Sequence, residues 1–273
     1  NRPPVASFTQ SATTVLTQVA VQFNASASYD PDGTIVSYLW TFGDGKNATG
    51  VIASHSYAEN SVYTVTLTVT DNDGAKTTAS STITALNRPP VASFTPSATQ
   101  VLSGQGITFN ATKSYDPDGF ILNFFWTFGD GVNGSGDIVQ HAYARKGVYN
   151  VLLRVTDNDG ATANATAVIN VGNQLPIASY TYFPSLPIAG QTVMFNASSS
   201  RDPDGSLVSY RWSFGDGNIT VVTVPLITHV YSTFGNYTTA LTVTDSDGGT
   251  ATNTQVVRTR GYPTAVFSYS PSS

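Results

Sequence analysis

Pairs of aspartates separated by one residue recur at six places in the chain. Asp-Pro-Asp-Gly stands at 30–33, 116–119 and 202–205, and Asp-Asn-Asp-Gly or Asp-Ser-Asp-Gly stands at 71–74, 157–160 and 245–248. Carboxylates this close in sequence can bind a divalent cation, serve as acid and base in glycoside hydrolysis, or cap the backbone of a turn. Sixteen of the 17 acidic residues are aspartate, so the chain assigns this residue to particular loops.

The acidic motifs lie within a sequence repeat that occurs three times in the chain. NRPPVASFT at 1–9 returns at 87–95 and loosely as NQLPIASYT at 173–181, and WTFGDG at 40–45 returns at 126–131 and as WSFGDG at 212–217. YPTAVFSY at 262–269 resembles one more opening strand. We therefore expect three domains, at 1–86, 87–172 and 173–260, followed by the first strand of a fourth repeat or a linker at 261–273.

Within each repeat the hydrophobic pattern has a period of two. Tyr63, Val65, Leu67 and Val69 alternate with threonines, and Val36, Tyr38, Trp40 and Phe42 alternate with other residues in the same way. Such runs, rich in β-branched and aromatic residues, indicate strands with one buried face. About seven short strands in each repeat predict an all-β fold of tandem immunoglobulin-like antiparallel β-sandwiches.

The aromatic residues have expected places in this fold. One tryptophan per repeat should lie in the sandwich core, and one tyrosine should anchor the turn before a long strand. Three other tyrosines are expected on the surface. These sets are Trp40, Trp126 and Trp212; Tyr63, Tyr149 and Tyr237; and Tyr180, Tyr182 and Tyr269.

The combined motifs resemble those of the PKD domain (polycystic kidney disease repeat). They are Asp-Pro-Asp-Gly, then Trp-Thr-Phe-Gly-Asp-Gly, then His-x-Tyr, then Tyr-x-Val-x-Leu-x-Val, and they cover nearly the whole chain in three copies. The resemblance implies a non-catalytic, extracellular, immunoglobulin-like sandwich. It also implies the settings in which such domains occur, which are archaeal surface-layer proteins, cell-surface glycoproteins, and spacers in secreted proteases and polysaccharide hydrolases.

Sandwich topology predicts which aspartates meet. The chain enters at one end, and the loop after the second strand and the loop between the last two strands lie at that same end. Four carboxylates and the opening asparagine of each repeat should gather there, and calcium would neutralise them with oxygen ligands. The predicted ligands are Asn1, Asp30, Asp32, Asp71 and Asp73; Asn87, Asp116, Asp118, Asp157 and Asp159; and Asn173, Asp202, Asp204, Asp245 and Asp247.

Other interpretations of these acids stay open. Asp, Pro and Gly are common turn residues, so the motifs can be turns alone, and this is the preferred interpretation of Asp44, Asp130 and Asp216. Glycoside hydrolysis is disfavoured, because it needs one cleft and the pair recurs three times on small domains. The three histidines share one repeat position and are interpreted as strand residues with a local hydrogen bond; they are His55, His141 and His229.

Eight Asn-x-Ser/Thr triplets predict N-glycosylation in an extracellular host. One set follows the Gly-Asp-Gly turn, where exposure is expected, and another lies next to inward phenylalanines, so that a period of two turns it outward. The predicted sites are Asn24, Asn47, Asn110, Asn133, Asn164, Asn196, Asn218 and Asn236.

Composition excludes several classes. The chain has no cysteine, which excludes disulfides, thiolate metal sites and a cysteine nucleophile. The net charge is −5, and the 12 Lys and Arg form no basic stripe, so nucleic acid is not an expected partner. No apolar run is long enough to span a bilayer. Because the chain opens on NRPPVASFT, we expect it to be processed or to be a segment of a longer protein.

The leading hypothesis is a non-catalytic extracellular structural protein. It would be a rod of tandem domains, stiffened by calcium and N-glycosylated, that builds a surface layer, sheath, stalk or filament. Its expected partners are other copies of itself or other cell-surface proteins. The alternatives are an adhesion or glycan-binding module, with glycans as partners, and a spacer segment of a secreted hydrolase.

Overall fold

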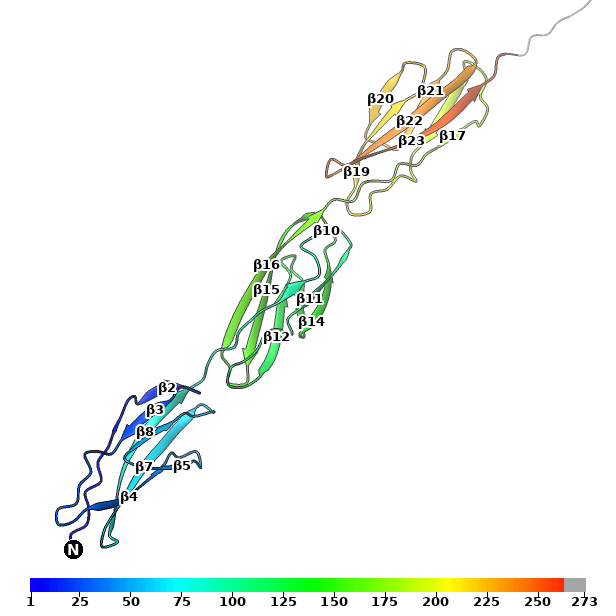
Figure 1. Cartoon of the computed structure of the whole chain (residues 1–273). Coiled ribbons are helices and arrows are strands. Elements are labelled where there is room, and N and C mark those ends of the chain that lie inside the picture. The colour runs from blue at the N-terminus through cyan, green and yellow to red at the C-terminus, as the bar shows by residue number, and fades with distance from the viewer. Residues whose placement is uncertain (263–273) are drawn as a thin grey trace, which may run out of the picture. The chain divides into compact units, whose positions relative to one another are not determined.

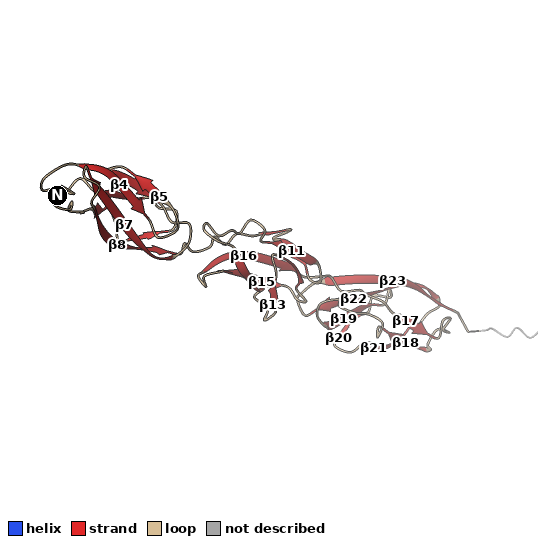
Figure 2. Ribbon diagram, turned by 90° about the horizontal axis from the view of Figure 1, so that it is seen from below, coloured by secondary structure: helices blue, strands red, loops and turns tan. Residues whose placement is uncertain are grey.

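The computed structural model of the chain describes residues 1–262, and these form strands and loops without a helix (Figures 1 and 2). The expected opening strand at 262–269 lies, apart from Tyr262, outside the described residues. Consistent with its all-β content, the described chain has no helix long and apolar enough to cross a membrane. The prediction of tandem all-β sandwiches is confirmed.

The first repeat consists of a five-stranded sheet in the order β2-β8-β7-β4-β5 and a three-stranded sheet in the order β1-β3-β6. Strand β2 pairs in parallel with the end of β8, whereas the other strand pairs of this repeat are antiparallel. The strands are β1 (Thr9–Gln10), β2 (Thr14–Leu16), β3 (Val21–Asn24), β4 (Ile35–Thr41), β5 (Asn47–Thr49), β6 (Ile52–His55), β7 (Ser61–Asp71) and β8 (Lys76–Leu86).

The second repeat has the same two sheets, in the orders β10-β16-β15-β12-β13 and β14-β11-β9. Here β10 takes the place of β2 and pairs in parallel with the end of β16. The strands are β9 (Thr95–Pro96), β10 (Gln100–Leu102), β11 (Gly106–Asn110), β12 (Ile121–Thr127), β13 (Asn133–Ser135), β14 (Ile138–Ala142), β15 (Gly147–Asp157) and β16 (Thr162–Gly172).

The third repeat keeps the three-stranded sheet, β17-β18-β21, but its larger sheet has only four strands, β20-β19-β22-β23. The counterpart of β2 and β10 is reduced to a single parallel bridge between Ile188 and Arg260. Pro187 lies beside that bridge and has no N–H to donate to a neighbouring strand. The strands are β17 (Thr181–Phe183), β18 (Thr192–Asn196), β19 (Leu207–Ser213), β20 (Ile219–Val222), β21 (Leu226–Val230), β22 (Gly235–Asp245) and β23 (Thr250–Thr259).

Each core lies between the two sheets of its repeat and is built by the predicted alternation. In the first repeat Val65, Leu67 and Val69 on β7 are fully buried. Phe23 from the three-stranded sheet packs against Trp40 from the five-stranded sheet, with ring centroids 5.7 Å apart. All three tryptophans are fully buried, which confirms their predicted core position.

The tyrosines confirm one prediction and correct another. Tyr63, which opens the long part of β7, donates its hydroxyl to the carbonyl of Glu59 at 2.9 Å, and Tyr149 and Tyr237 make the same turn-anchoring bond. Tyr180 was expected on the surface but is only 3% exposed. It lies just before β17, at the position where the other repeats place a core phenylalanine, and packs edge-on against Trp212 at 5.0 Å.

Candidate functional site

The first Asp of the second motif organises the turn between the last two strands of each repeat. In the turn between β7 and β8, the Asp71 carboxylate accepts the backbone N–H groups of Asp73 at 2.9 Å and Ala75 at 2.8 Å through Oδ1. Its counterparts Asp157 and Asp245 accept the equivalent N–H groups, and all three residues are at most 1% exposed. These carboxylates therefore stabilise the turn through its backbone N–H groups, and they are buried within it.

The opening asparagine of each repeat binds the other oxygen of that carboxylate. Asn1 donates its Nδ2 to Asp71 Oδ2 at 3.0 Å, and Asn87 and Asn173 make the same bond to Asp157 and Asp245 at 2.9 Å. The next backbone N–H reaches the Asp-Pro-Asp-Gly loop, as Arg2 does with Asp32 Oδ2 at 3.0 Å. The chain entry and the two acidic loops thus meet at one end of each sandwich, as the topology predicted.

Several side-chain oxygens at this end are fully buried and accept no hydrogen bond from any described residue. Each belongs to an opening asparagine or to an Asp-Pro-Asp-Gly aspartate, and each can only accept. They are Asp30 Oδ2; Asn87 Oδ1, Asp116 Oδ2 and Asp118 Oδ1; and Asn173 Oδ1, Asp202 Oδ2 and Asp204 Oδ1. Buried polar atoms are almost always partnered, so gathered acceptors without a donor fit a hard cation such as Ca²⁺.

The electrostatics of the second and third repeats agree with this interpretation. Burial raises the pKa of Asp116 above its ordinary value, and the neighbouring charges of Asp118 and Asp157 raise it further. Burial raises the pKa of Asp202 in the same way, together with the charges of Asp204 and Asp245. A carboxylate surrounded by carboxylates is stabilised by a bound cation.

The second Asp of the second motif points elsewhere. Asp159 accepts the Asn60 side chain at 3.0 Å, and Asp247 forms an ion pair with Lys146 at 2.6 Å. Among the described residues no three Asp, Glu, His or Cys side chains are grouped so that they could hold a metal by themselves. Amide and main-chain oxygens would therefore have to complete any cation site. Of the predicted ligands, Asp159 and Asp247 bind partners elsewhere, and Asp73 is exposed.

One neighbouring side chain was missed by sequence reasoning. The middle residue of the second motif turns its amide oxygen toward the first acidic loop: Asn72 Oδ1 accepts the N–H of Thr34 at 2.8 Å. A Cβ placed on Gly33 would lie 2.3 Å from Asn72 Oδ1 and 2.5 Å from Asp30 Oδ2. Asn158 holds the equivalent position in the second repeat, whereas the third has Ser246. The glycine after each Asp-Pro-Asp is thus needed for space.

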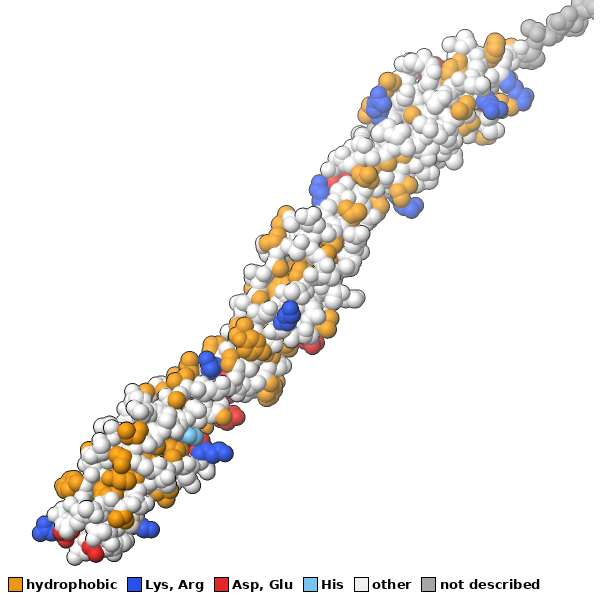
Figure 3. Space-filling view, in the orientation of Figure 1, with side chains coloured by type: hydrophobic (Ala, Val, Ile, Leu, Met, Phe, Trp, Pro, Cys, Tyr) orange, Lys and Arg blue, Asp and Glu red, His pale blue; other side chains and the backbone are white. Residues whose placement is uncertain are grey.

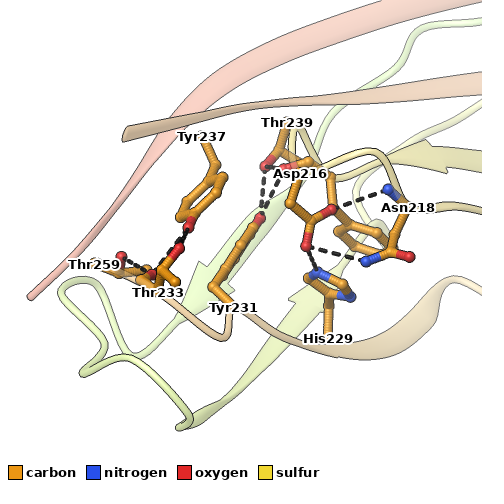
Figure 4. Close-up of polar contacts among 9 residues, drawn as sticks. Asp216, Asn218, His229, Tyr231, Thr233, Tyr237, Thr239 and Thr259 are labelled. Atoms are coloured by element: carbon orange, nitrogen blue, oxygen red, sulfur yellow. Dashed lines mark hydrogen bonds and ion pairs between the residues drawn. The ribbon is translucent and has the colours of Figure 1, made fainter. Parts of the chain in front are cut away.

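The Gly-Asp-Gly aspartates confirm the turn interpretation, and two of them also bind a histidine side chain. Asp44 and Asp216 each accept the N–H two residues on at 3.0 Å, and each binds a histidine Nε2 at 2.7 Å. In the third repeat that histidine is His229 on β21, whose contact with Asp216 is drawn in Figure 4. His229 also stacks on Phe214 with centroids 3.9 Å apart. The predicted local hydrogen bond is therefore confirmed for two of the three histidines, His55 and His229.

The glycosylation triplets fall into two structural groups. Asn47, Asn133, Asn164, Asn218 and Asn236 are exposed. The remaining three end β3, β11 and β18 and are only half-exposed, because each side-chain oxygen accepts the N–H two residues on; they are Asn24, Asn110 and Asn196.

Charged groups outside these loops are sparse. On the face shown in Figure 3, Lys and Arg side chains are scattered over the surface, in keeping with only 12 such residues in the chain. A groove of about 540 Å³ in the second repeat is lined by Gln100, Val101, Leu102, Gln105, Gly147, Val148, Asn170, Val171 and Gly172. It contains no aromatic or charged side chain.

Comparison with known proteins yields relatives that are mostly much longer. The chain is 36% identical over 146 residues to the pre-pro-metalloprotease PrtV of Vibrio cholerae, which covers 54% of this chain and 16% of that protein. It is 32% identical over 284 residues to the dyslexia-associated protein KIAA0319 homologue of Mus musculus, which covers 94% of this chain and 26% of that protein. The chain therefore spans about a quarter or less of these relatives.

A solved structure and a family model match the repeats themselves. The PKD1 domain of the Vibrio cholerae metalloprotease PrtV is 39% identical, and the match covers 31% of this chain and 98% of that domain with a TM-score of 0.28. The family model for the PKD domain matches residues 1–85, 87–171 and 173–260, which is nearly all of the described chain. The chain therefore belongs to the PKD domain family, which it represents in three tandem copies.

Proposed function

We propose that this chain is a non-catalytic extracellular segment whose role is structural, with calcium at the entry end of each sandwich. The observation that carries the proposal is the threefold recurrence of one arrangement: an opening asparagine, two acidic loops and buried oxygens that lack donors. A single catalytic centre has no need of three copies, whereas a repeated structural element does. Tandem PKD domains fit a structural or spacer role.

The residues that would hold calcium follow from the buried acceptors. They are the opening asparagine and the aspartates of Asp-Pro-Asp-Gly, joined by backbone oxygens. When bound, the cation supplies positive charge that neutralises the gathered carboxylates and ties the two loops to the chain entry. The protein's own contribution is to hold those carboxylates in place through Asp71 and its counterparts.

Calorimetry on the full chain tests this proposal. After treatment with a chelator, millimolar calcium should raise the Tm by several degrees, since a ligand at a hundred times its Kd stabilises by about 2.7 kcal/mol per site. The triple variant D30N/D116N/D202N should lose most of that rise, and Asp137→Asn, which changes an acid outside these loops, should keep it. An unchanged Tm of the wild-type chain would reduce the motifs to turn chemistry.

Glycosylation is proposed for the five exposed asparagines, of which Asn218 first has to release its Nδ2 from Asp216 Oδ2, 3.1 Å away. The three strand-end asparagines use their side-chain oxygen in a local turn and should be modified less. Peptide mapping of material isolated from the native cell surface measures both groups. Equal occupancy of the two groups would show that the local hydrogen bond does not protect, and a mass equal to that of the bare chain would contradict glycosylation.

We consider two kinds of longer protein that would contain this chain. As part of a surface layer, sheath, stalk or filament, it would be flanked by further structural repeats. As a spacer of a secreted hydrolase it would be flanked by a catalytic domain, and the similarity to a metalloprotease supports this version. The sequence of the complete gene decides between them. Glycan binding is less favoured, since the groove in the second repeat offers no aromatic ring to a sugar, and a glycan array checks that point.

A further inference from the structure

Two buried hydroxyl groups connect successive repeats. Thr17, just after β2, donates its Oγ1 to Asp118 Oδ2, and Ser103, just after β10, donates its Oγ to Asp204 Oδ2. Both hydroxyl-bearing residues are 0% exposed. Thr17 and Asp118 lie in the same compact unit of the fold, which comprises residues 1–96, 109–139 and 151–167. Ser103 and Asp204 lie together in the other unit, which comprises residues 97–108, 140–150 and the chain from 168 onward. In both cases the acceptor is the second aspartate of the next Asp-Pro-Asp-Gly loop.

We propose that Thr17 and Ser103 are positioning residues for the acidic site of the following repeat. The inference rests on the proposed calcium function and adds a dependence that the individual repeats do not have: the sites of the second and third repeats are completed by the repeat before them. They should therefore bind calcium more tightly than the site of the first repeat.

The hydrogen bonds explain how a hydroxyl can order the site. Asp118 Oδ2 accepts both Thr17 and the N–H of Arg88 at 3.0 Å, and its Oδ1 is left buried without a donor. Asp204 repeats this arrangement with Ser103 at 2.5 Å and the N–H of Gln174 at 3.1 Å. With one oxygen fixed by two donors, the carboxylate cannot rotate freely, and the other oxygen is directed to the cluster of acceptors.

The first repeat provides the contrast. Asp32 is exposed, and both of its oxygens share one donor, the N–H of Arg2, at 3.2 and 3.0 Å. Among the described residues at the entry end of the first repeat, only Asp30 Oδ2 is a buried oxygen without a donor, whereas the entry ends of the second and third repeats have three such atoms each. The same ligand residues are thus less enclosed in the first repeat, where Asp32 accepts the N–H of Arg2 and no hydroxyl of a described residue.

Further bonds from the same segments support these junctions. Gln18 donates its Nε2 to the carbonyl of Pro117 at 2.7 Å, next to the Thr17 contact. At the second junction Gln174 donates its Nε2 to the carbonyl of Ser103 at 2.6 Å. At the equivalent position in the third repeat the chain has Ala189, which has no hydroxyl. The hydroxyl is therefore a feature of two specific positions and not a requirement of the sandwich.

Calcium titration of the full chain, followed by NMR, tests the proposal. The amides of Gly33, Gly119 and Gly205 report one site each. In the wild-type chain the second and third sites should fill first. In the double variant T17V/S103A these two sites should weaken roughly tenfold, as expected when a hydrogen bond to a charged group is lost, while the first site is unchanged. Ser114→Ala is the matched control, because it removes a hydroxyl bonded within its own repeat.

The outcomes separate the two proposals. Weakening confined to the second and third sites supports the inference. Equal affinities at all three sites, or a double variant that binds like the wild-type chain, overturns it and leaves the proposed calcium function intact. A wild-type chain that binds no calcium at any site overturns the proposed function and this inference with it. Single variants T17V and S103A, each weakening only one site, keep the test valid if the double variant folds poorly.

Discussion

The third sandwich differs from the first two in the interior of one end, although its topology is nearly the same. Thr239 on β22 is fully buried where the first repeat has Val65, and Thr259 on β23 is 8% exposed where the first has Ala85. The Thr239 hydroxyl bonds to Tyr231 at 3.0 Å (Figure 4). Thr259 accepts the N–H of Gly235 at 2.9 Å.

These threonines are tolerated because they are all partnered. Thr259 also donates to the carbonyl of Thr233 at 3.0 Å, and the Tyr180 hydroxyl donates to the carbonyl of Thr239 at 2.8 Å. Burial raises the pKa of Tyr231 to about 12, so its hydroxyl stays protonated and can donate. The comparison shows that this fold accepts either an apolar or a hydrogen-bonded interior at that end, provided that each polar group finds a partner.

The core tryptophan makes a hydrogen bond in the first two repeats that it does not make to the described residues of the third. Trp40 donates its Nε1 to the carbonyl of Gly50 at 2.9 Å, and Trp126 donates to Gly136 at 2.8 Å. Trp212 Nε1 is buried and has no acceptor among the described residues. The two glycines have φ angles of 106° and 112°, whereas Val224 precedes Pro225 at the corresponding place and does not readily take such an angle.

Replacing Gly50 of the first repeat by valine, the residue at the corresponding place in the third, should have the largest effect on stability. Gly50→Val forces a β-branched residue to a positive φ, and relaxing that φ turns the carbonyl of residue 50 away from the buried N–H of Trp40. The combined cost should be about 2–4 kcal/mol. Hydrogen exchange of β4 and β5, followed by mass spectrometry, measures the loss locally. Val224→Gly is the reverse exchange and should cost little or stabilise. Equal costs for the two changes would show that the glycine is not what permits the tryptophan bond.

A smaller effect is expected from the glycines beside the acidic loops. A Cβ on Gly119 would lie 2.1 Å from Asn158 Oδ1, whereas on Gly205 the nearest atoms are Asp202 Oδ2 at 2.6 Å and the smaller Ser246 side chain at 2.8 Å. Gly119→Ala should therefore cost about 1–3 kcal/mol and Gly205→Ala less. Denaturant unfolding with a probe in each repeat measures the difference. Gly106→Ala, where a Cβ meets nothing within 4 Å, is the control.

The Asp44–His55 and Asp216–His229 pairs should make the stability of the first and third repeats depend on acid pH in the same way. Burial alone would raise the pKa of Asp44, but the N–H of Lys46 and the pair with His55 hold it below the ordinary value of 3.8. Asp216 behaves in the same way. Because the folded pKa is depressed, this stabilisation is present above about pH 4 and is lost as the pH falls through the folded pKa.

Melting curves between about pH 2 and 6 test that dependence. Asp44→Asn should flatten the acid side of the first repeat's stability curve, and Asp216→Asn should do so for the third. A variant that keeps the full acid slope would show that other carboxylates carry it. Because each change acts on its own repeat, the unchanged repeat in the same chain is the internal control.

The fold could be predicted from sequence because its signals are local. Val65, Leu67 and Val69 alternate with threonines and are buried as expected. Prediction failed where the backbone departs from regular geometry. A β-bulge between Ile35 and Ser37 shifts the alternation at the start of β4, and Val36 is consequently 64% exposed.

The site was predictable only in part, for a similar reason. Topology brings the acidic loops together, so it could be foreseen that the opening asparagine meets both aspartates of Asp-Pro-Asp-Gly and the first aspartate of the second motif. Which of two neighbouring aspartates turns inward depends on single hydrogen bonds: Asp157 holds the turn, whereas Asp159 accepts Asn60 from far away in the sequence. The role of Thr17 depends on a residue 101 positions away, which no motif encodes.

The corner tyrosines offer the smallest test of how the first and third repeats differ. Tyr63 makes one bond, to the carbonyl of Glu59 at 2.9 Å, whereas Tyr237 bonds both the carbonyl of Thr233 at 2.9 Å and its hydroxyl at 2.8 Å. Tyr237→Phe should therefore cost more than Tyr63→Phe, by about 0.5–1 kcal/mol. Local hydrogen exchange at the turn before β7 and β22 measures both. If Thr233→Val removes the difference, the additional hydroxyl bond is its source, and if the difference persists, the polar network around Thr239 and Thr259 stiffens that turn instead.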